Sequence, residues 1–228
     1  MKQLLILIFT ITAFNANAQL IHDQSHTDLS FWKFKVKLEE AILKKDTTLL
    51  KSLMADKVLE SKDICGNQGC DKSEMIKYYF KNNDNNWNEL QQIVRFGFYK
   101  NIDDYNEIPI LHSKNVFSAP SYLKRIDTEI ETVVLGENVN IREKPSLKAK
   151  VIRQASYEVF KCDCNITDQT ETTYQTVDGI DWLEIKLDNG KVGYIASKFT
   201  SSDIYKELTV AKVEGRWKIV SFYSPPGC

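Results

Sequence analysis

The sequence contains few of the residues and motifs that catalysis or metal binding requires. Its 228 residues include three histidines, and no His-Glu-x-x-His, Gly-x-Ser-x-Gly or phosphate-binding glycine motif occurs. A cysteine nucleophile needs a histidine base held by a third group, whereas His112 stands apart from every cysteine along the chain. We therefore expect no catalytic activity, no cofactor and no metal site. Paired carboxylates remain an open alternative, because 31 residues are acidic.

Net charge is also nearly absent, since 30 lysines and arginines stand against 31 aspartates and glutamates. A chain without a broad field of one sign is not expected to select nucleic acid or an anionic membrane. Residues 81–86 are rich in Asn and Asp but lack the Asp-x-Asp spacing and the final Glu of a calcium loop. We therefore expect no nucleic-acid partner, and these residues are predicted to form a solvated turn.

The N-terminus has the pattern of a secretory signal peptide. Lys2 precedes the apolar run Leu4–Ile11, and Ala16-Asn17-Ala18 follows with small residues at a cleavage spacing. The run is too short to span a bilayer comfortably, so no membrane span is expected. We place the mature start at Gln19 and expect a periplasmic or secreted protein. The alternative is a buried N-terminal strand.

Export changes the interpretation of the five cysteines, because disulfides persist in oxidising compartments. Cys65 and Cys70 enclose two glycines and an asparagine, which lets the chain turn back, so a local disulfide is predicted. Cys162 and Cys164 are one residue apart, and a bond between them would close a strained ring. One of this pair is therefore expected to bond elsewhere, with Cys228 as the available partner. The odd count leaves one thiol over.

The first hundred residues of the mature chain predict helices that pack on one face. Thr27 or Asp28 can cap a helix that runs to about Lys45. Its buried stripe is expected to contain Phe31, Phe34, Leu38, Ala41 and Ile42, widened by Trp32 and Val36. The further elements expected are a helix from Asp46 that includes Leu53 and Met54, an extended piece over Val58–Ile64, a helix holding Met75, Ile76, Tyr79 and Phe80, and a helix over Trp87–Arg95.

The last residues of the chain predict a β-hairpin. Leu208 and Val210 lead to a turn at Glu214-Gly215, and apolar residues follow from Trp217 to Phe222. A lone two-stranded hairpin is marginal in water, so it must pair with the short strands expected between residues 98 and 122. This ending is similar to the last strand of helix-on-curved-sheet folds of the nuclear-transport-factor type. A discontinuous α+β domain is therefore predicted, with a small antiparallel sheet completed by the C-terminal hairpin.

Between these parts, residues 139–199 show short strands joined by tight turns, with residues alternating between an inner and an outer face. A polar insertion, residues 162–181, interrupts them and is longer than a hairpin loop usually needs. The segments that carry the pattern are Val139-Asn140-Ile141-Arg142, Pro145-Ser146, Val151-Ile152, Trp182 to Leu187, Asn189-Gly190, Gly193-Tyr194-Ile195 and Ser197-Lys198-Phe199.

These segments resemble the bacterial SH3-like domain, a small β-barrel attached to many exported proteins that work at the cell wall. The resemblance implies a shallow aromatic groove for an extended peptide. The groove candidates are Tyr157, Trp182, Tyr194 and Phe199, with Trp182 and Tyr194 favoured; for each, a place in the barrel core is the alternative. The implied ligand is a peptidoglycan peptide or an envelope protein. The region before the barrel is similar to exported proteins of Bacteroidetes-like bacteria, for which no activity can be carried over.

The predicted organisation has four segments: a signal peptide (1–18), the first part of an α+β domain (19–131), an inserted SH3-like barrel (132–201) and a returning hairpin (202–228). We expect a non-catalytic binding protein that is a monomer or a weak oligomer. One alternative is a structural subunit or carrier of a small apolar ligand held between the first helix and the final hairpin. A further alternative is an accessory cell-wall hydrolase.

Overall fold

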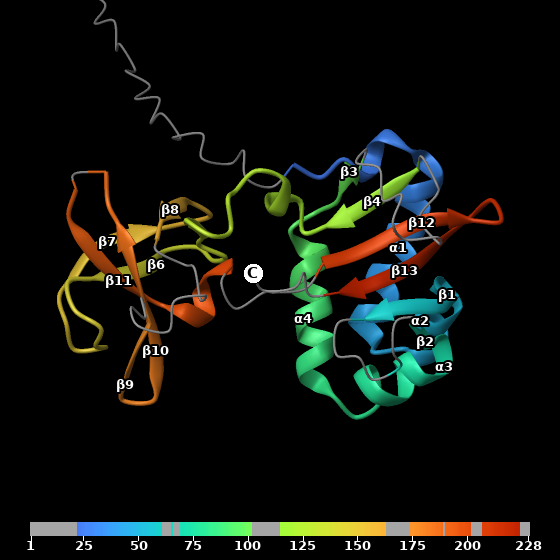
Figure 1. Cartoon of the computed structure of the whole chain (residues 1–228), viewed down its shortest axis with the longest axis horizontal. Helices are drawn as coiled ribbons and strands as arrows, with labels where there is room; N and C mark the ends of the chain where they lie inside the picture. The colour runs from blue at the N-terminus through green and yellow to red at the C-terminus, as the bar shows by residue number, and fades with distance from the viewer. Residues whose placement is uncertain are drawn as a thin grey trace, which may run out of the picture.

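The computed structural model describes residues 22–60, 65, 69–101, 115–162, 174–188, 190–201 and 207–223. They form a mixed α+β structure with two sheets that lie side by side, one covered by helices and one curled upon itself (Figure 1). The predicted signal peptide and the mature start at Gln19 lie outside the described residues. No helix in the described part of the chain is long and apolar enough to cross a membrane.

The first sheet has six strands, and the C-terminal hairpin lies at its centre. This confirms the predicted return of the hairpin to the N-terminal region. The sheet is larger than predicted. It is not wholly antiparallel, because β1 (Met54–Glu60) and β13 (Arg216–Tyr223) pair in parallel. In spatial order the strands are β2 (Cys70–Asp71), β1 (Met54–Glu60), β13 (Arg216–Tyr223), β12 (Glu207–Val213), β4 (Val116–Ala119) and β3 (Tyr99–Asn101).

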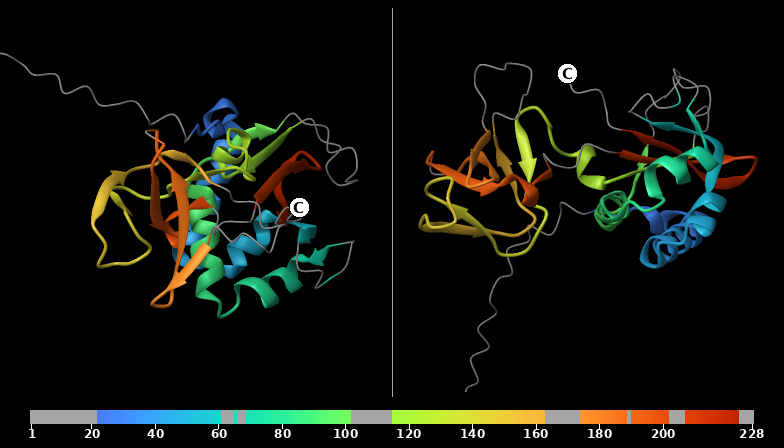
Figure 2. Two further views of the ribbon diagram at one scale, coloured as in Figure 1. Left: turned by 60° about the vertical axis from the view of Figure 1, so that its left-hand side comes forward. Right: turned by 90° about the horizontal axis from the view of Figure 1, so that it is seen from below.

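Helices cover one face of this sheet (Figure 2). Asp28, one of the two predicted caps, caps α1 (Leu29–Lys44), since its carboxylate accepts from the backbone N–H groups of Ser30 and Phe31. Asp46 caps α2 (Thr47–Leu53) in the same way. The helical segments are η1 (Ser25–Thr27), α1 (Leu29–Lys44), α2 (Thr47–Leu53), α3 (Lys72–Met75), the π-helix η3 (Ile76–Phe80) and α4 (Asp84–Arg95).

Several sequence predictions in this region were wrong in detail. Trp32 and Val36 are exposed, because the inward stripe of α1 is narrower than the apolar pattern suggested. Met54 begins β1 instead of ending α2, so the extended piece starts earlier than Val58. Asp84 already belongs to α4 and not to the preceding turn, since Asn83 caps this helix by accepting from the backbone N–H of Asn86.

The second sheet has seven strands and is curled, as Figure 1 shows. It contains the stretch expected to form an SH3-like barrel, and that finer assignment stays a prediction. Most strands are joined to their neighbours by short turns, and Thr200 forms an isolated bridge back to Val134. In spatial order the strands are β5 (Glu131–Val133), β8 (Val159–Lys161), β10 (Ile180–Lys186), β11 (Val192–Ala196), β6 (Val139–Arg142) and β7 (Val151–Ala155), with β9 (Tyr174–Val177) paired to β10.

Each sheet has its own hydrophobic core, and a smaller cluster lies where they meet. Aromatic rings dominate the first core, where Phe31 stacks on Phe117 with ring centroids 3.9 Å apart. Aliphatic side chains dominate the second, including Ile141, Leu183 and Ile185. The junction cluster contains buried Phe96, Tyr122, Ile126 and Val133, packed by partly buried Leu123, Leu135 and Tyr157.

The predicted disulfide between Cys65 and Cys70 is present, with the two Cα atoms 4.9 Å apart. It lies at the edge of the six-stranded sheet, next to the short antiparallel pair of β1 and β2. Cys162 also takes part in a disulfide. Cys164 and Cys228 lie outside the described residues, so the predicted long-range connection stays a prediction.

Candidate functional site

The favoured pair of groove candidates, Trp182 and Tyr194, lies on one face of the hairpin β10–β11. Trp182 pairs with Ala196 and Tyr194 pairs with Glu184, so both side chains project from the same side of the two strands. Leu183 and Ile185 project from the opposite side into the core. The face that carries Trp182 and Tyr194 is therefore the outer face of the curled sheet.

Tyr194 is half-buried on this outer face and is held by polar neighbours. Its hydroxyl donates to the Glu184 carboxylate at 2.9 Å. Burial raises the pKa of Tyr194, and the hydrogen bond to the Glu184 carboxylate raises it further, while a hydrogen bond with Gln175 acts in the opposite direction. The phenol therefore remains protonated and presents a fixed ring edge, suited to binding rather than to proton transfer at neutral pH.

Trp182 is 1% exposed although it lies outside the core cluster of the curled sheet. The helix η6 (Ser197–Phe199) packs against β10 at this end. No described residue accepts a hydrogen bond from the indole Nε1–H of Trp182. A buried donor without an acceptor costs about 1–3 kcal/mol. The side chain of Trp182 therefore projects from the outer face but is covered there, and it is not accessible to a ligand in this structure.

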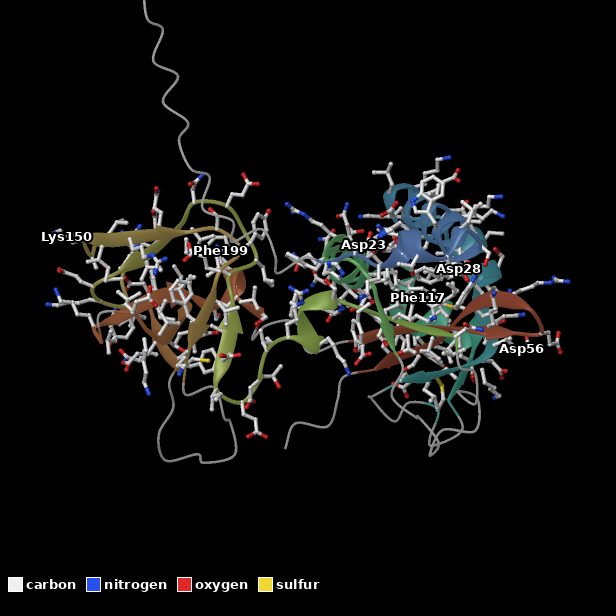
Figure 3. All side chains as sticks on the ribbon, turned by 90° about the horizontal axis from the view of Figure 1, so that it is seen from above. Asp23, Asp28, Asp56, Phe117, Lys150 and Phe199 are labelled. Carbon is white, nitrogen blue, oxygen red and sulfur yellow. A yellow bond between two sulfur atoms is a disulfide. The ribbon has the colours of Figure 1, made fainter. Side chains whose placement is uncertain are left out.

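Phe199 is the most accessible of the four candidates, with 42% of its surface exposed. It ends η6, and its carbonyl accepts from the Leu135 backbone N–H at 2.8 Å. The ammonium of Lys198 lies 5.0 Å from the centre of the Phe199 ring. Phe199, labelled in Figure 3, is thus an exposed ring on a hydrogen-bonded backbone, with a cation beside it.

Tyr157 lies away from the face that carries Trp182 and Tyr194, at the junction of the two sheets. Its backbone has a φ of 54°, in the left-handed region that a tyrosine seldom adopts. Its hydroxyl accepts from the Arg95 guanidinium at 3.0 Å, and its ring lies 6.3 Å from that of Phe96. Both partners belong to the end of α4, so the side chain of Tyr157 links the curled sheet to the helical layer.

The sequence reasoning missed a buried polar pair, Glu60 and Tyr79, in the six-stranded part. Glu60 is 7% exposed at the end of β1, and its carboxylate accepts from the Tyr79 hydroxyl and from the Cys65 backbone N–H. Tyr79 comes from the π-helix η3, an irregularity that often marks functional sites. The signal in the sequence was an acidic residue at an inward position of a strand, next to the cysteine loop.

Glu60 is also one of three residues whose ligand atoms are arranged like those of a metal site. One ligand atom each from Glu60, Cys65 and Cys70 lie within 4.8 Å of one another. Both sulfur atoms are joined in the disulfide, and a metal requires thiolates. In the oxidised state this group therefore offers one anionic ligand, and the carboxylate has an evident structural role as an acceptor for Tyr79 and the cysteine loop.

No family model, no curated protein and no solved structure matches this chain.

Proposed function

We propose that this protein is a non-catalytic exported protein whose curled sheet folds as an SH3-like barrel and binds an extended peptide of the cell envelope. The ligand class is a peptidoglycan peptide or a segment of an envelope protein. The observation that carries the proposal is Phe199, a rigidly mounted and exposed aromatic ring beside the cation of Lys198. Aromatic anchors of this kind recognise extended peptides at little cost in conformational entropy.

The path of the chain around Phe199 supports the assignment to a small barrel. The helix η6 follows β11, and Thr200 then bridges to Val134 beside β5. The Leu135 N–H also donates to the Phe199 carbonyl. These contacts place the segment after β11 against the residues that follow the edge strand β5, so that edge is partly covered, as in small barrels.

The outer face of β10–β11 supports a peptide as the ligand. Tyr194 and Glu184 supply an aromatic ring and a carboxylate, and Trp182 has an indole N–H for which no described residue is an acceptor. Trp182 is buried, so the groups available to a peptide on this face are those of Tyr194 and Glu184. This arrangement suits binding and contains no paired nucleophile and base.

The alternative of a small apolar ligand between α1 and the final hairpin has less support. Phe31 lies 5.0 Å from the Trp217 ring and 5.1 Å from the Phe98 ring, in addition to its stacking on Phe117. These rings fill the space between α1 and β13 at the level where the ligand would lie. The aromatic side chains of this part therefore serve the core.

A retention assay on purified peptidoglycan tests the proposal. The chain from Gln19 should be retained, and Phe199→Ala should weaken retention by about fivefold to thirtyfold, which corresponds to about 1–2 kcal/mol for truncating a contributing interface residue. Trp182→Phe keeps a ring but removes the N–H, and should weaken retention by a smaller factor. Tyr194→Ala should behave like Phe199→Ala.

The chain provides a matched control in Tyr78, which is exposed and has the Lys77 ammonium 4.8 Å from its ring centre. Tyr78→Ala removes an exposed ring beside a lysine from the six-stranded part and should leave retention unchanged. Absence of retention of the parent chain would rule out the peptidoglycan peptide. Equal losses from Tyr78→Ala and Phe199→Ala would rule out the site.

A further inference from the structure

The curled sheet has an end that lies farthest from the six-stranded sheet (Figures 1 and 2), and residues at this end have exposed apolar side chains. We call it the distal end and define it by the loop 143–150, Val151 and Ile152, and the described turn residues 186–188 and 190–192. Leu147 is 60% exposed, and Val151, Ile152 and Val192 are exposed as well. Single exposed apolar residues are ordinary, but four of them at one end of a small sheet require an explanation.

Strand pairing brings these apolar residues to the same end. Arg142, the last residue of β6, pairs with Val151 on one side and with Tyr194 on the other. The starts of β7 and β11 therefore flank the end of β6. A Cβ placed on Gly193, next to Val192, would lie 3.5 Å from the Ile152 side chain, so the strands carrying Val192 and Ile152 approach closely.

The loop that carries Leu147 is fixed by hydrogen bonds across its base and inside its turn. The Glu143 N–H donates to the Lys150 carbonyl at 3.0 Å, and the Arg142 guanidinium donates to the Ala149 carbonyl at 2.7 Å. Within the turn, the Ala149 N–H donates to the Ser146 carbonyl at 3.1 Å. These hydrogen bonds fix the loop in a conformation that exposes the Leu147 side chain to solvent.

Positive charge surrounds the apolar residues, although the whole chain has a net charge of −1. Glu143 and Asp188 are the acidic residues of the distal end, and Asp188 lies 3.9 Å from the guanidinium of Arg153. Lys150 lies at the extremity of the molecule in Figure 3. The exposed lysines of the distal end are Lys144, Lys148, Lys150, Lys186 and Lys191.

We propose that the distal end docks on the surface of an anionic lipid bilayer, with Leu147 entering the boundary between headgroups and acyl chains. Lysines beside a bilayer are attracted to anionic headgroups, while exposed apolar side chains gain free energy by leaving water. A soluble polyanion would use the lysines but leave Leu147 and Ile152 in water. The combination of both kinds of residue therefore favours a lipid surface.

This inference does not depend on the proposed peptide site. Phe199 and Trp182 lie toward the other end of β10 and β11, since Trp182 pairs with Ala196 while Lys186 pairs with Val192. A protein that docks through the distal end would keep Phe199, Trp182 and the six-stranded sheet away from the bilayer, with Tyr194 between the two ends. The two proposals can therefore fail separately.

Vesicle co-sedimentation at low ionic strength tests the proposal. The chain from Gln19 should bind vesicles of equimolar phosphatidylglycerol and phosphatidylcholine, and bind phosphatidylcholine alone at least tenfold more weakly. Replacing Lys144, Lys148 and Lys150 by alanine should weaken binding by about a hundredfold, at about fivefold for each lysine. Leu147→Ser should weaken it by about tenfold, because an apolar side chain that enters the bilayer is lost.

Leu43→Ser is the matched control, because Leu43 is an exposed leucine beside Lys44 on α1 in the other part of the chain. This variant should bind as the parent does. Circular dichroism confirms that each variant is folded. No binding to the mixed vesicles, equal binding to both vesicle types, or a loss caused equally by Leu43→Ser would overturn the proposal. Binding that responds to the lysines and to salt but not to Leu147→Ser would indicate a polyanion site and overturn it too.

Discussion

The two sheets of this protein use aromatic residues in opposite ways. In the six-stranded part, Phe31, Phe117 and Trp217 are buried and in mutual contact, between a helix and the sheet. In the curled sheet the core is mainly aliphatic, and Tyr194 and Phe199 lie on the outside. Aromatic rings therefore form much of the core in one part, whereas in the other Tyr194 and Phe199 lie outside the core.

The difference follows from the geometry of the two interiors. A helix packed on a sheet leaves a layer deep enough for stacked rings, and large aromatic side chains gain most from filling it. A small curled sheet encloses a narrow interior that branched aliphatic side chains fill, such as Ile141 and Ile195. Phe160 is the aromatic ring in the core cluster of the curled sheet, whereas Trp182, Tyr194 and Phe199 lie outside that cluster.

The largest expected difference between the two parts concerns a phenylalanine in each. Phe117→Ala should lower the free energy of unfolding by about 3–5 kcal/mol, because it leaves a cavity under the Phe31 ring. Phe199→Ala should change it by about 0.5 kcal/mol or less, since the ring is exposed. Urea titration of both variants measures the difference. Similar losses in the two variants would contradict the contrast in aromatic use.

The disulfide of the six-stranded part is expected to have the next largest effect. It closes a loop between Cys65 and Cys70 at a separation of five residues, so replacing both by alanine should cost about 2 kcal/mol by the chain-entropy relation. Thermal unfolding with probes in both parts would show the lower midpoint in the six-stranded part. An unchanged midpoint there would mean that the bond does not constrain the unfolded chain.

Asp23 should give the six-stranded part a dependence on pH. Burial alone would raise the pKa of Asp23, but hydrogen bonds from Lys35, from the Phe98 N–H and from Ser25 outweigh it and hold the pKa below its ordinary value. Asp23→Asn should therefore cost about 1 kcal/mol at neutral pH. The folded pKa is the lower one, so the advantage of Asp23 is complete above 3.8 and is lost as the pH falls through the folded value.

Unfolding free energies of the parent chain and of Asp23→Asn across this range measure the effect. The matched control is Asp84→Asn, because Asp84 is an exposed partner of Lys45 on the surface and should change stability by about 0.5 kcal/mol or less. A gap between the parent and Asp23→Asn that persists well below pH 3.8 would contradict the assignment.

The smallest expected effect tests whether the two parts are joined. Arg95→Ala and Tyr157→Phe each remove the hydrogen bond at the junction, and each should cost about 0.5 kcal/mol because the bond is exposed. In a double-mutant cycle, the free energy of unfolding lost in the combined variant should be no larger than the loss in either single variant, because the same hydrogen bond is removed in all three. Fully additive losses would show that Arg95 and Tyr157 do not act on each other.

Local signals in the sequence predicted much of the fold. Asp28 as one of two candidate caps, a second helix starting near Asp46, the disulfide between Cys65 and Cys70, and the C-terminal hairpin were all predicted, because each depends on residues close in sequence or on a simple rule of pairing. The pair of Trp182 and Tyr194 was also expected, and the two lie on one face of a hairpin. The role of that face stays a prediction.

Contacts between distant segments could not be read from the pattern. Trp32 has the spacing of a core residue, but only the packing of the sheet decides which side of α1 is covered. Tyr157 looked like a groove residue and lies against α4, sixty-two positions away in sequence from its partner Arg95. Glu60 and Tyr79 come together because β1 and η3 are neighbours in the folded chain.

The sequence by itself determined which helices and hairpins form, which cysteines form the local bridge and which residue types are available for a site. These features depend on hydrogen bonds and spacing within a few residues, and the chain specifies them locally. The tertiary structure alone decided which aromatic rings are buried and which are exposed, because burial depends on which surfaces meet. It buried Trp182 and left Phe199 and Leu147 accessible.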